Sequence, residues 1–189
     1  MRFSIQHLLI VIATLTTVVG AQVTSNVINR VFLVKGPDEA GTAFTIEVDG
    51  RQYLVTAKHV VKGMKEDDSI QIRKDDQWTA VPVQVFRCED PVDIAVLVPS
   101  SQLSASFPLE PTSAGMFFGG DTFFLGFPYA KTTEFKLAGG YPLPLIKRAT
   151  LSGMNPLVPD KGVIIVLDGY NNPGFSGSPV CFATLRRAN

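Results

Sequence analysis

The chain has 189 residues, of which 46% are hydrophobic and 18% are charged, so it can bury a core and is too apolar to be disordered. Its 17 basic and 17 acidic residues cancel, which leaves no electrostatic footprint for nucleic acid or an anionic membrane surface. The basic doublets Lys147-Arg148 and Arg186-Arg187 are too short to change this, and we expect them to be solvated surface. Length and composition therefore predict one globular domain or two small packed halves.

The N-terminus reads as a targeting segment. Arg2 supplies a positive charge, residues 8–20 form a short apolar run, and small residues lead to Ala21. This pattern predicts a signal peptide over residues 1–21, an exported (periplasmic or secreted) protein, and a mature domain over residues 22–189. The alternative is an uncleaved N-terminal membrane anchor. No later segment is long and apolar enough to span a bilayer.

The two cysteines, Cys88 and Cys181, are far apart in the sequence. They could form one bridge in an oxidising compartment, but each lies in an apolar, strand-like context that favours two separate buried thiols. With a single histidine in the mature chain, they do not provide the close-spaced ligand pairs of a zinc site. We therefore expect no bound metal.

Short apolar or alternating runs predict β-strands along the whole mature chain. Asp49-Gly50 is a strong hairpin signal, and Pro82 indicates an edge strand or a bulge. A stretch rich in Ser, Pro and Thr at 100–115 separates a first half, about 28–99, from a second, about 116–189. There is no pattern for a helix of three turns. The expected strands are 30–35, 42–48, 51–57, 69–73, 78–86 and 94–98, followed by 121–127, 147–152, 162–167 and 178–182.

Ser176 is a candidate nucleophile, because it lies in a turn between Gly174 and Gly177. A serine hydroxyl needs a base, and the base needs a third group to orient it. His59, at the end of a strand, is the one histidine outside the predicted signal peptide. Asp93, directly before an apolar strand, is the preferred orienting carboxylate, with Glu89 and Asp90 as competitors.

The order of these residues separates two classes of hydrolase. An α/β-hydrolase runs Ser, Asp, His and places its serine before a helix, whereas this chain runs His, Asp, Ser between predicted strands. With its motifs, the chain resembles the trypsin-like (chymotrypsin-fold) serine peptidases, and is similar in style to the short-loop bacterial protease domain of the high-temperature-requirement proteases. The segments that carry the resemblance are 41–44, 54–59, 93–97, 119–121, 126–128 and 173–180.

The resemblance implies an all-β fold of two antiparallel β-barrels and a serine endopeptidase that works through an acyl-enzyme. His59 would be the general base, Asp93 its orienting carboxylate and Ser176 the nucleophile, while the backbone amides of Gly174 and Ser176 would hold the oxyanion. The partner would be a peptide or protein substrate. No cofactor is implied, because this chemistry needs none, and the sequence says nothing of oligomeric state.

The family's second barrel continues after the serine with two more strands, whereas only residues 177–189 follow Ser176 here. We therefore expect a second barrel that is truncated at the C-terminus, with an unpaired edge. The alternative function is a catalytically impaired, truncated protease-like fragment or a peptide-binding module.

Overall fold

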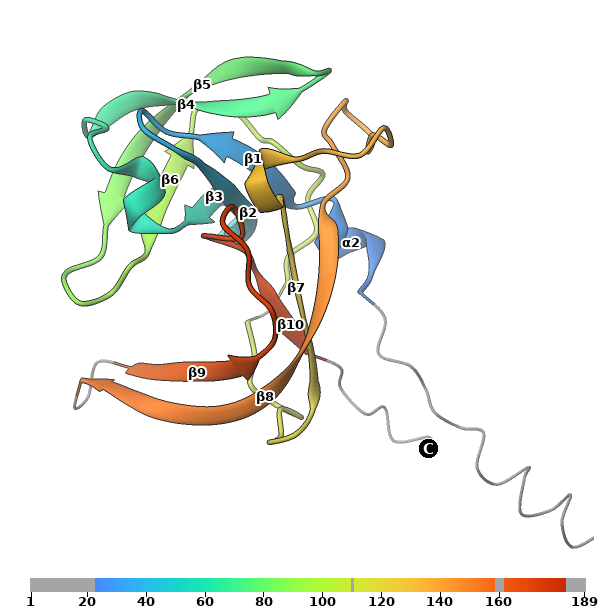
Figure 1. Cartoon of the computed structure of the whole chain (residues 1–189). Coiled ribbons are helices and arrows are strands. Elements are labelled where there is room, and N and C mark those ends of the chain that lie inside the picture. The colour runs from blue at the N-terminus through green and yellow to red at the C-terminus, as the bar shows by residue number, and fades with distance from the viewer. Residues whose placement is uncertain (1–22, 110, 159–161, 183–189) are drawn as a thin grey trace, which may run out of the picture.

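The computed structural model describes residues 23–109, 111–158 and 162–182, which form a nearly all-β molecule with two lobes (Figure 1). The predicted signal peptide and the tail at 183–189 lie outside the described residues. The first lobe is a closed antiparallel barrel in which the strands follow the order β1-β2-β3-β6-β5-β4. This confirms the all-β fold class. The strands are β1 (Val31–Lys35), β2 (Ala40–Val48), β3 (Arg51–Thr56), β4 (Asp67–Lys74), β5 (Gln77–Arg87) and β6 (Ala95–Pro99).

The predicted hairpin between β2 and β3 is present. Asp49 and Gly50 have φ angles of 52° and 73°, the left-handed pair that a tight two-residue turn requires. Asp75 and Asp76 form the same kind of left-handed turn between β4 and β5, with φ angles of 47° and 60°. In both turns short polar or glycine residues adopt a conformation that larger side chains disfavour.

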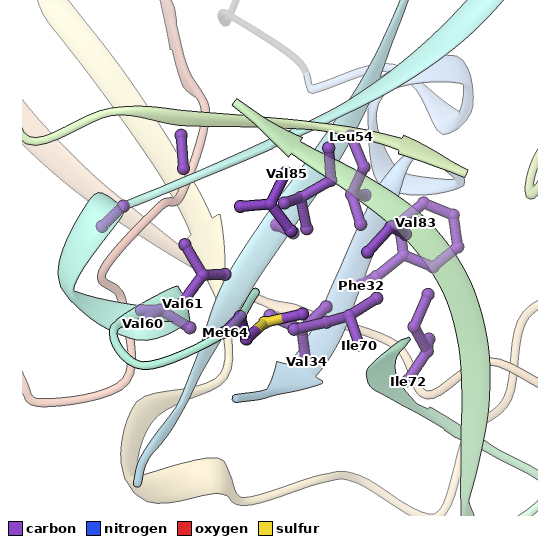
Figure 2. Close-up of a cluster of buried hydrophobic side chains, with 14 residues drawn as sticks. Phe32, Val34, Leu54, Val60, Val61, Met64, Ile70, Ile72, Val83 and Val85 are labelled. Carbon is purple, nitrogen blue, oxygen red and sulfur yellow. The ribbon is translucent and has the colours of Figure 1, made fainter. Parts of the chain in front are cut away.

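Strand β1 joins the two lobes because its side chains pack into both of them. Its four apolar residues are all buried, because the strand has a core on each face. Phe32 and Val34 point into the barrel interior, which Figure 2 shows together with Leu54, Ile70 and Val85. Each such fully buried side chain contributes about 1.5–3 kcal/mol. On the other face, the alternate β1 residues Val31 and Leu33 form a second buried cluster with Leu125 and Phe127 of the second lobe.

Pro82 does not lie on an edge strand or in a bulge, so that expectation was wrong. Strand β5 pairs with β4 on one side, in a continuous register that includes Pro82 and Ser69, and with β6 on the other. The β6 pairing ends at Val83 and Pro99, one residue short of Pro82. Because the β5–β6 pairing stops before Pro82, the lack of a backbone N–H on proline removes no hydrogen bond from this pairing. The Pro82 carbonyl still accepts a hydrogen bond from the Ser100 N–H.

The second lobe is a four-stranded antiparallel sheet in the order β10-β7-β8-β9. Its strands are β7 (Asp121–Gly126), β8 (Leu145–Val158), β9 (Gly162–Asp168) and β10 (Val180–Phe182). The order repeats β4-β1-β2-β3 of the first barrel, since β7 pairs with β8 and β10 as β1 pairs with β2 and β4. In the described part of this lobe no strand joins β9 to β10. Along β9 the apolar residues 163–166 are 39–61% exposed.

Helical structure is brief in the described ranges. It consists of α2 (Ser25–Ile28) and the 3₁₀ turns η1 (Lys58–Val61) and η2 (Pro128–Ala130). No helix among the described residues is long and apolar enough to cross a membrane.

The described residues of the segment 100–115 form no strand, but part of the segment is held on the first barrel by hydrogen bonds. The side chain of Gln52 accepts hydrogen bonds from the backbone amides of Leu103 and Ser104 at 2.8 and 3.1 Å. Nearby, Arg30 is 4% exposed and donates to the carbonyl of Ala105 at 3.0 Å. Residues 103–107 of the segment therefore form a strap that is packed on the first barrel.

The two cysteines are unpaired, but only one of them is shielded from solvent. Cys181, on β10, is partly buried, and burial raises the pKa of its thiol. Cys88 is exposed, which corrects the expectation of two buried thiols. The reason is its position one residue beyond the end of β5, where the chain leaves the barrel.

Candidate active site

His59 lies in η1, directly after strand β3, and its imidazole is fastened to Asp93. The Asp93 carboxylate accepts a hydrogen bond from His59 Nδ1 at 2.6 Å and a second from the His59 backbone N–H at 3.0 Å. A carboxylate can only accept, so Nδ1 carries a proton, and in the neutral form of the ring Nε2 is an acceptor. The two side chains are 42% and 52% exposed, so this edge of the site is open to solvent.

Asp90, one of the two competitors for that role, has a different partner. Its carboxylate accepts a hydrogen bond from Lys58 Nζ at 2.5 Å, and this ammonium lowers the pKa of Asp90. Lys58 thereby engages the neighbouring acid and leaves Asp93 to the histidine. The structure brings Asp93 to His59, as the sequence predicts.

The turn that carries Ser176 is fixed to strand β2 through a single residue, Thr42. The Thr42 N–H donates to the Ser176 carbonyl at 2.8 Å, and its hydroxyl donates to the Gly174 carbonyl, also at 2.8 Å. The same hydroxyl accepts a hydrogen bond from Phe127 N–H, in the second lobe, at 3.1 Å. Thr42 is fully buried. It therefore joins the first barrel, the serine turn and the second sheet at one point.

The glycines of this turn are required by its conformation. Gly174 and Gly177 have φ angles of 101° and 83°, in the region where a side chain is strained. Space is also lacking, because a Cβ at Gly177 would collide with the Thr42 carbonyl and one at Gly174 with the Phe127 carbonyl.

The Ser176 turn and the 3₁₀ turn that carries His59 both pack against Gly41 of strand β2. A Cβ on Gly41 would lie 2.7 Å from the side chain of Val60, the residue after His59, and 3.1 Å from the Ser176 carbonyl. In the described part of the chain no hydrogen bond joins Ser176 Oγ to His59 Nε2. The charged group within 4.0 Å of Nε2 is instead the carboxylate of Glu39, which the sequence reasoning did not single out.

Lys147 is a second site residue that the sequence reasoning missed, since it was assigned to solvated surface. It lies on β8, where its ammonium donates hydrogen bonds to the Tyr170 carbonyl at 3.0 Å and to the Asn172 side chain. It also lies over the rings of Tyr170 and Phe175, 4.9 and 5.4 Å from their centres. Asn172 in turn donates to the hydroxyl of Tyr129. Lys147 therefore organises the segment that leads into Ser176.

These features define an all-β protein of two lobes, with a histidine–carboxylate pair after strand β3 and a serine turn fixed to the neighbouring strand β2. The family model described as the trypsin-like peptidase domain matches residues 41–186, and the chain belongs to this family. Membership supports a serine protease that acts on peptides or proteins.

Solved structures show the same fold at low sequence identity. The inactive form of the Rv3671c protease has a TM-score of 0.58 at 20% identity, over 82% of this chain and 73% of that one. Deg5 gives 0.58 at 18% identity, over 95% and 82%. The HtrA-type protease AlgW gives 0.59 at 21% identity, over 84% of this chain and 48% of AlgW. A comparison with curated proteins finds no match.

Proposed function

We propose that the chain is an exported serine endopeptidase that hydrolyses peptide bonds through His59, Asp93 and Ser176. The observation that carries the proposal is the pairing of His59 Nδ1 with Asp93 at 2.6 Å, in a 3₁₀ turn that packs against Gly41 as the Ser176 turn does. This pairing leaves Nε2 free to accept a proton. A base with a fixed tautomer is what a serine nucleophile requires.

In the proposed reaction, His59 Nε2 takes the proton of Ser176 Oγ as that oxygen bonds to the substrate carbonyl carbon. The carbonyl oxygen becomes an oxyanion, which the N–H groups of Gly174 and Ser176 would stabilise. The imidazolium then gives its proton to the leaving nitrogen, and the C–N bond breaks. Water repeats the sequence on the acyl-enzyme: its proton passes through Nε2 to Ser176 Oγ, and the acid product leaves.

Attack requires Ser176 Oγ and His59 Nε2 to come within about 3 Å. The serine side chain can change this separation by rotating about its Cα–Cβ bond, while the backbone stays held by Thr42. Catalytic hydrogen bonds are often longer before substrate binds. The geometry of the site is therefore compatible with the proposed chemistry.

The alternative is a peptide-binding module without catalysis. The missing Ser176–His59 hydrogen bond favours it, together with an apolar cavity of about 750 Å³ between the lobes. Strand β2 lines this cavity through Phe44 and Ile46, β9 through Ile165, and β10 through Val180 and Cys181. Such a module would hold extended peptides and leave them intact.

A fluorophosphonate probe separates the two functions, because it forms a covalent bond only with an activated serine. The full chain is expected to be labelled. Ser176→Ala should abolish the labelling, and Asp93→Asn should slow it by several orders of magnitude through the wrong histidine tautomer. Equal labelling of the wild type and Ser176→Ala would refute the assignment of the nucleophile. Peptide binding without any labelling would favour the module.

A further inference from the structure

Glu39 is held at the edge of the candidate active site by a rigid turn. The turn covers residues 36–39, directly before β2, and is closed by a hydrogen bond from Gly36 N–H to the Glu39 carbonyl at 2.9 Å. Gly36 is packed against η1, since a Cβ at this position would collide with the carbonyl oxygen of Val60. The backbone of Glu39 is thus placed relative to the same 3₁₀ turn that carries His59.

The carboxylate of Glu39 faces the catalytic edge of the imidazole. Its Oε1 lies 4.0 Å from His59 Nε2, while Asp93 occupies the opposite nitrogen. Within the described residues this carboxylate has no hydrogen bond, and the basic group within 4.0 Å of it is the His59 ring. Its side chain is 50% exposed. Glu39 therefore contributes little to the fold through its charge and is accessible to a ligand.

The proposed reaction indicates which residues of a bound peptide would lie near the Glu39 carboxylate. In the proposed reaction Nε2 protonates the leaving nitrogen, so that nitrogen must come within about 3 Å of Nε2. The Glu39 carboxylate would then lie no more than about 7 Å from it. Consecutive Cα atoms are about 3.8 Å apart, so the first two residues after the scissile bond lie within reach of Glu39.

The charges near Glu39 favour a basic side chain at those positions. Asp38 is exposed beside it and has the same sign. Lys58, the nearest lysine in sequence to His59, already binds Asp90. A lysine or arginine of the substrate has a long stem that can carry its charge to a carboxylate a few ångströms away.

We propose that Glu39 is a specificity-determining residue that selects peptides with lysine or arginine at the first or second position after the cleaved bond. The inference rests on the proposed peptidase function. A half-exposed ion pair of this kind is worth about a two- to fivefold preference. Because salt screens exposed charges, the preference should shrink at 1 M salt, where the screening length is about 3 Å.

The test uses a peptide that the full chain cleaves, found by mass spectrometry in a digest of unfolded casein. Three internally quenched versions differ only at the second residue after the cleaved bond, which is lysine, glutamine or glutamate. The readout is the ratio of kcat/KM between the lysine and glutamate peptides within each variant. A ratio cancels any change in general catalytic rate that a substitution near His59 causes.

The wild type should prefer the lysine peptide by about two- to fivefold over the glutamine peptide, with glutamate lower still. Glu39→Gln should bring the lysine-to-glutamate ratio close to one, and Glu39→Lys should invert it. Asp38→Asn, which removes the neighbouring carboxylate, is the matched control and should retain the preference.

A ratio that is the same in wild type, Glu39→Gln and Glu39→Lys would overturn this inference. So would a preference that Asp38→Asn abolishes and Glu39→Gln leaves intact. Fluorophosphonate labelling of the wild type keeps the two proposals apart. If the protein is labelled and the ratio ignores residue 39, only the specificity is wrong; if it is not labelled, the peptidase proposal itself has failed.

Discussion

Thr42 offers the most direct test of how the serine turn is held. Its hydroxyl donates to the Gly174 carbonyl and accepts from the Phe127 N–H, and both bonds cross from the first barrel to other parts of the chain. Thr42→Val replaces the hydroxyl with a methyl group of nearly the same shape. It therefore leaves the packing in place and removes both bonds.

The cost follows from the burial of the two orphaned groups. A buried polar group without a partner costs about 1–3 kcal/mol. Phe127 is fully buried, which puts its N–H in the upper part of this range, whereas Gly174 is partly buried and lies in the lower part. We expect Thr42→Val to lower the free energy of unfolding by about 2–4 kcal/mol.

Urea denaturation of wild type, Thr42→Val and Thr42→Ser measures this loss. Serine retains the hydroxyl and loses one methyl group, so Thr42→Ser should cost about 1 kcal/mol. Thr42→Val should also slow fluorophosphonate labelling more than Thr42→Ser does, because Gly174 belongs to the proposed oxyanion hole. The reasoning is refuted if the valine variant is at least as stable as the serine variant.

Two further predictions concern other parts of the molecule. Lys147→Met keeps a long side chain but removes the hydrogen bonds to the 170–172 segment, so kcat for peptide cleavage should fall. Lys147→Arg should have a kcat between those of Lys147→Met and the wild type. Equal kcat in wild type and Lys147→Met would contradict the positioning role. Ser106 and Phe107, in the strap, donate hydrogen bonds to the Glu47 carboxylate and lower the pKa of Glu47 below its usual value. The ionised Glu47 therefore stabilises the folded protein at a pH above the usual pKa of glutamate. This stabilisation is lost as the pH falls through the lowered pKa that Glu47 has in the folded state. Glu47→Gln should therefore lose less stability than wild type between pH 6 and pH 3.5 in urea titrations, and parallel losses would show that Glu47 is not part of the acid response.

The sequence determined those features that depend on neighbouring residues. Strand β1 is recognisable because four consecutive apolar residues need burial on both faces, and the turn at Asp49-Gly50 because both positions need a positive φ. The residue types of the site are also visible, since His59, Asp93 and Ser176 stand in a recognisable order between strands. Such signals are local, and a single sequence carries them directly.

The tertiary structure decided which of these residues meet and what surrounds them. Thr42 bonds groups that are 85 and 132 residues away, and Lys147 reaches a segment more than 20 residues downstream, so neither contact leaves a pattern in the sequence. The exposure of Cys88 and the approach of Glu39 to His59 depend on where the chain leaves the barrel and on how one turn packs. Local propensity determines the strands, whereas the closure of the barrel and the packing of the second sheet against it determine the site.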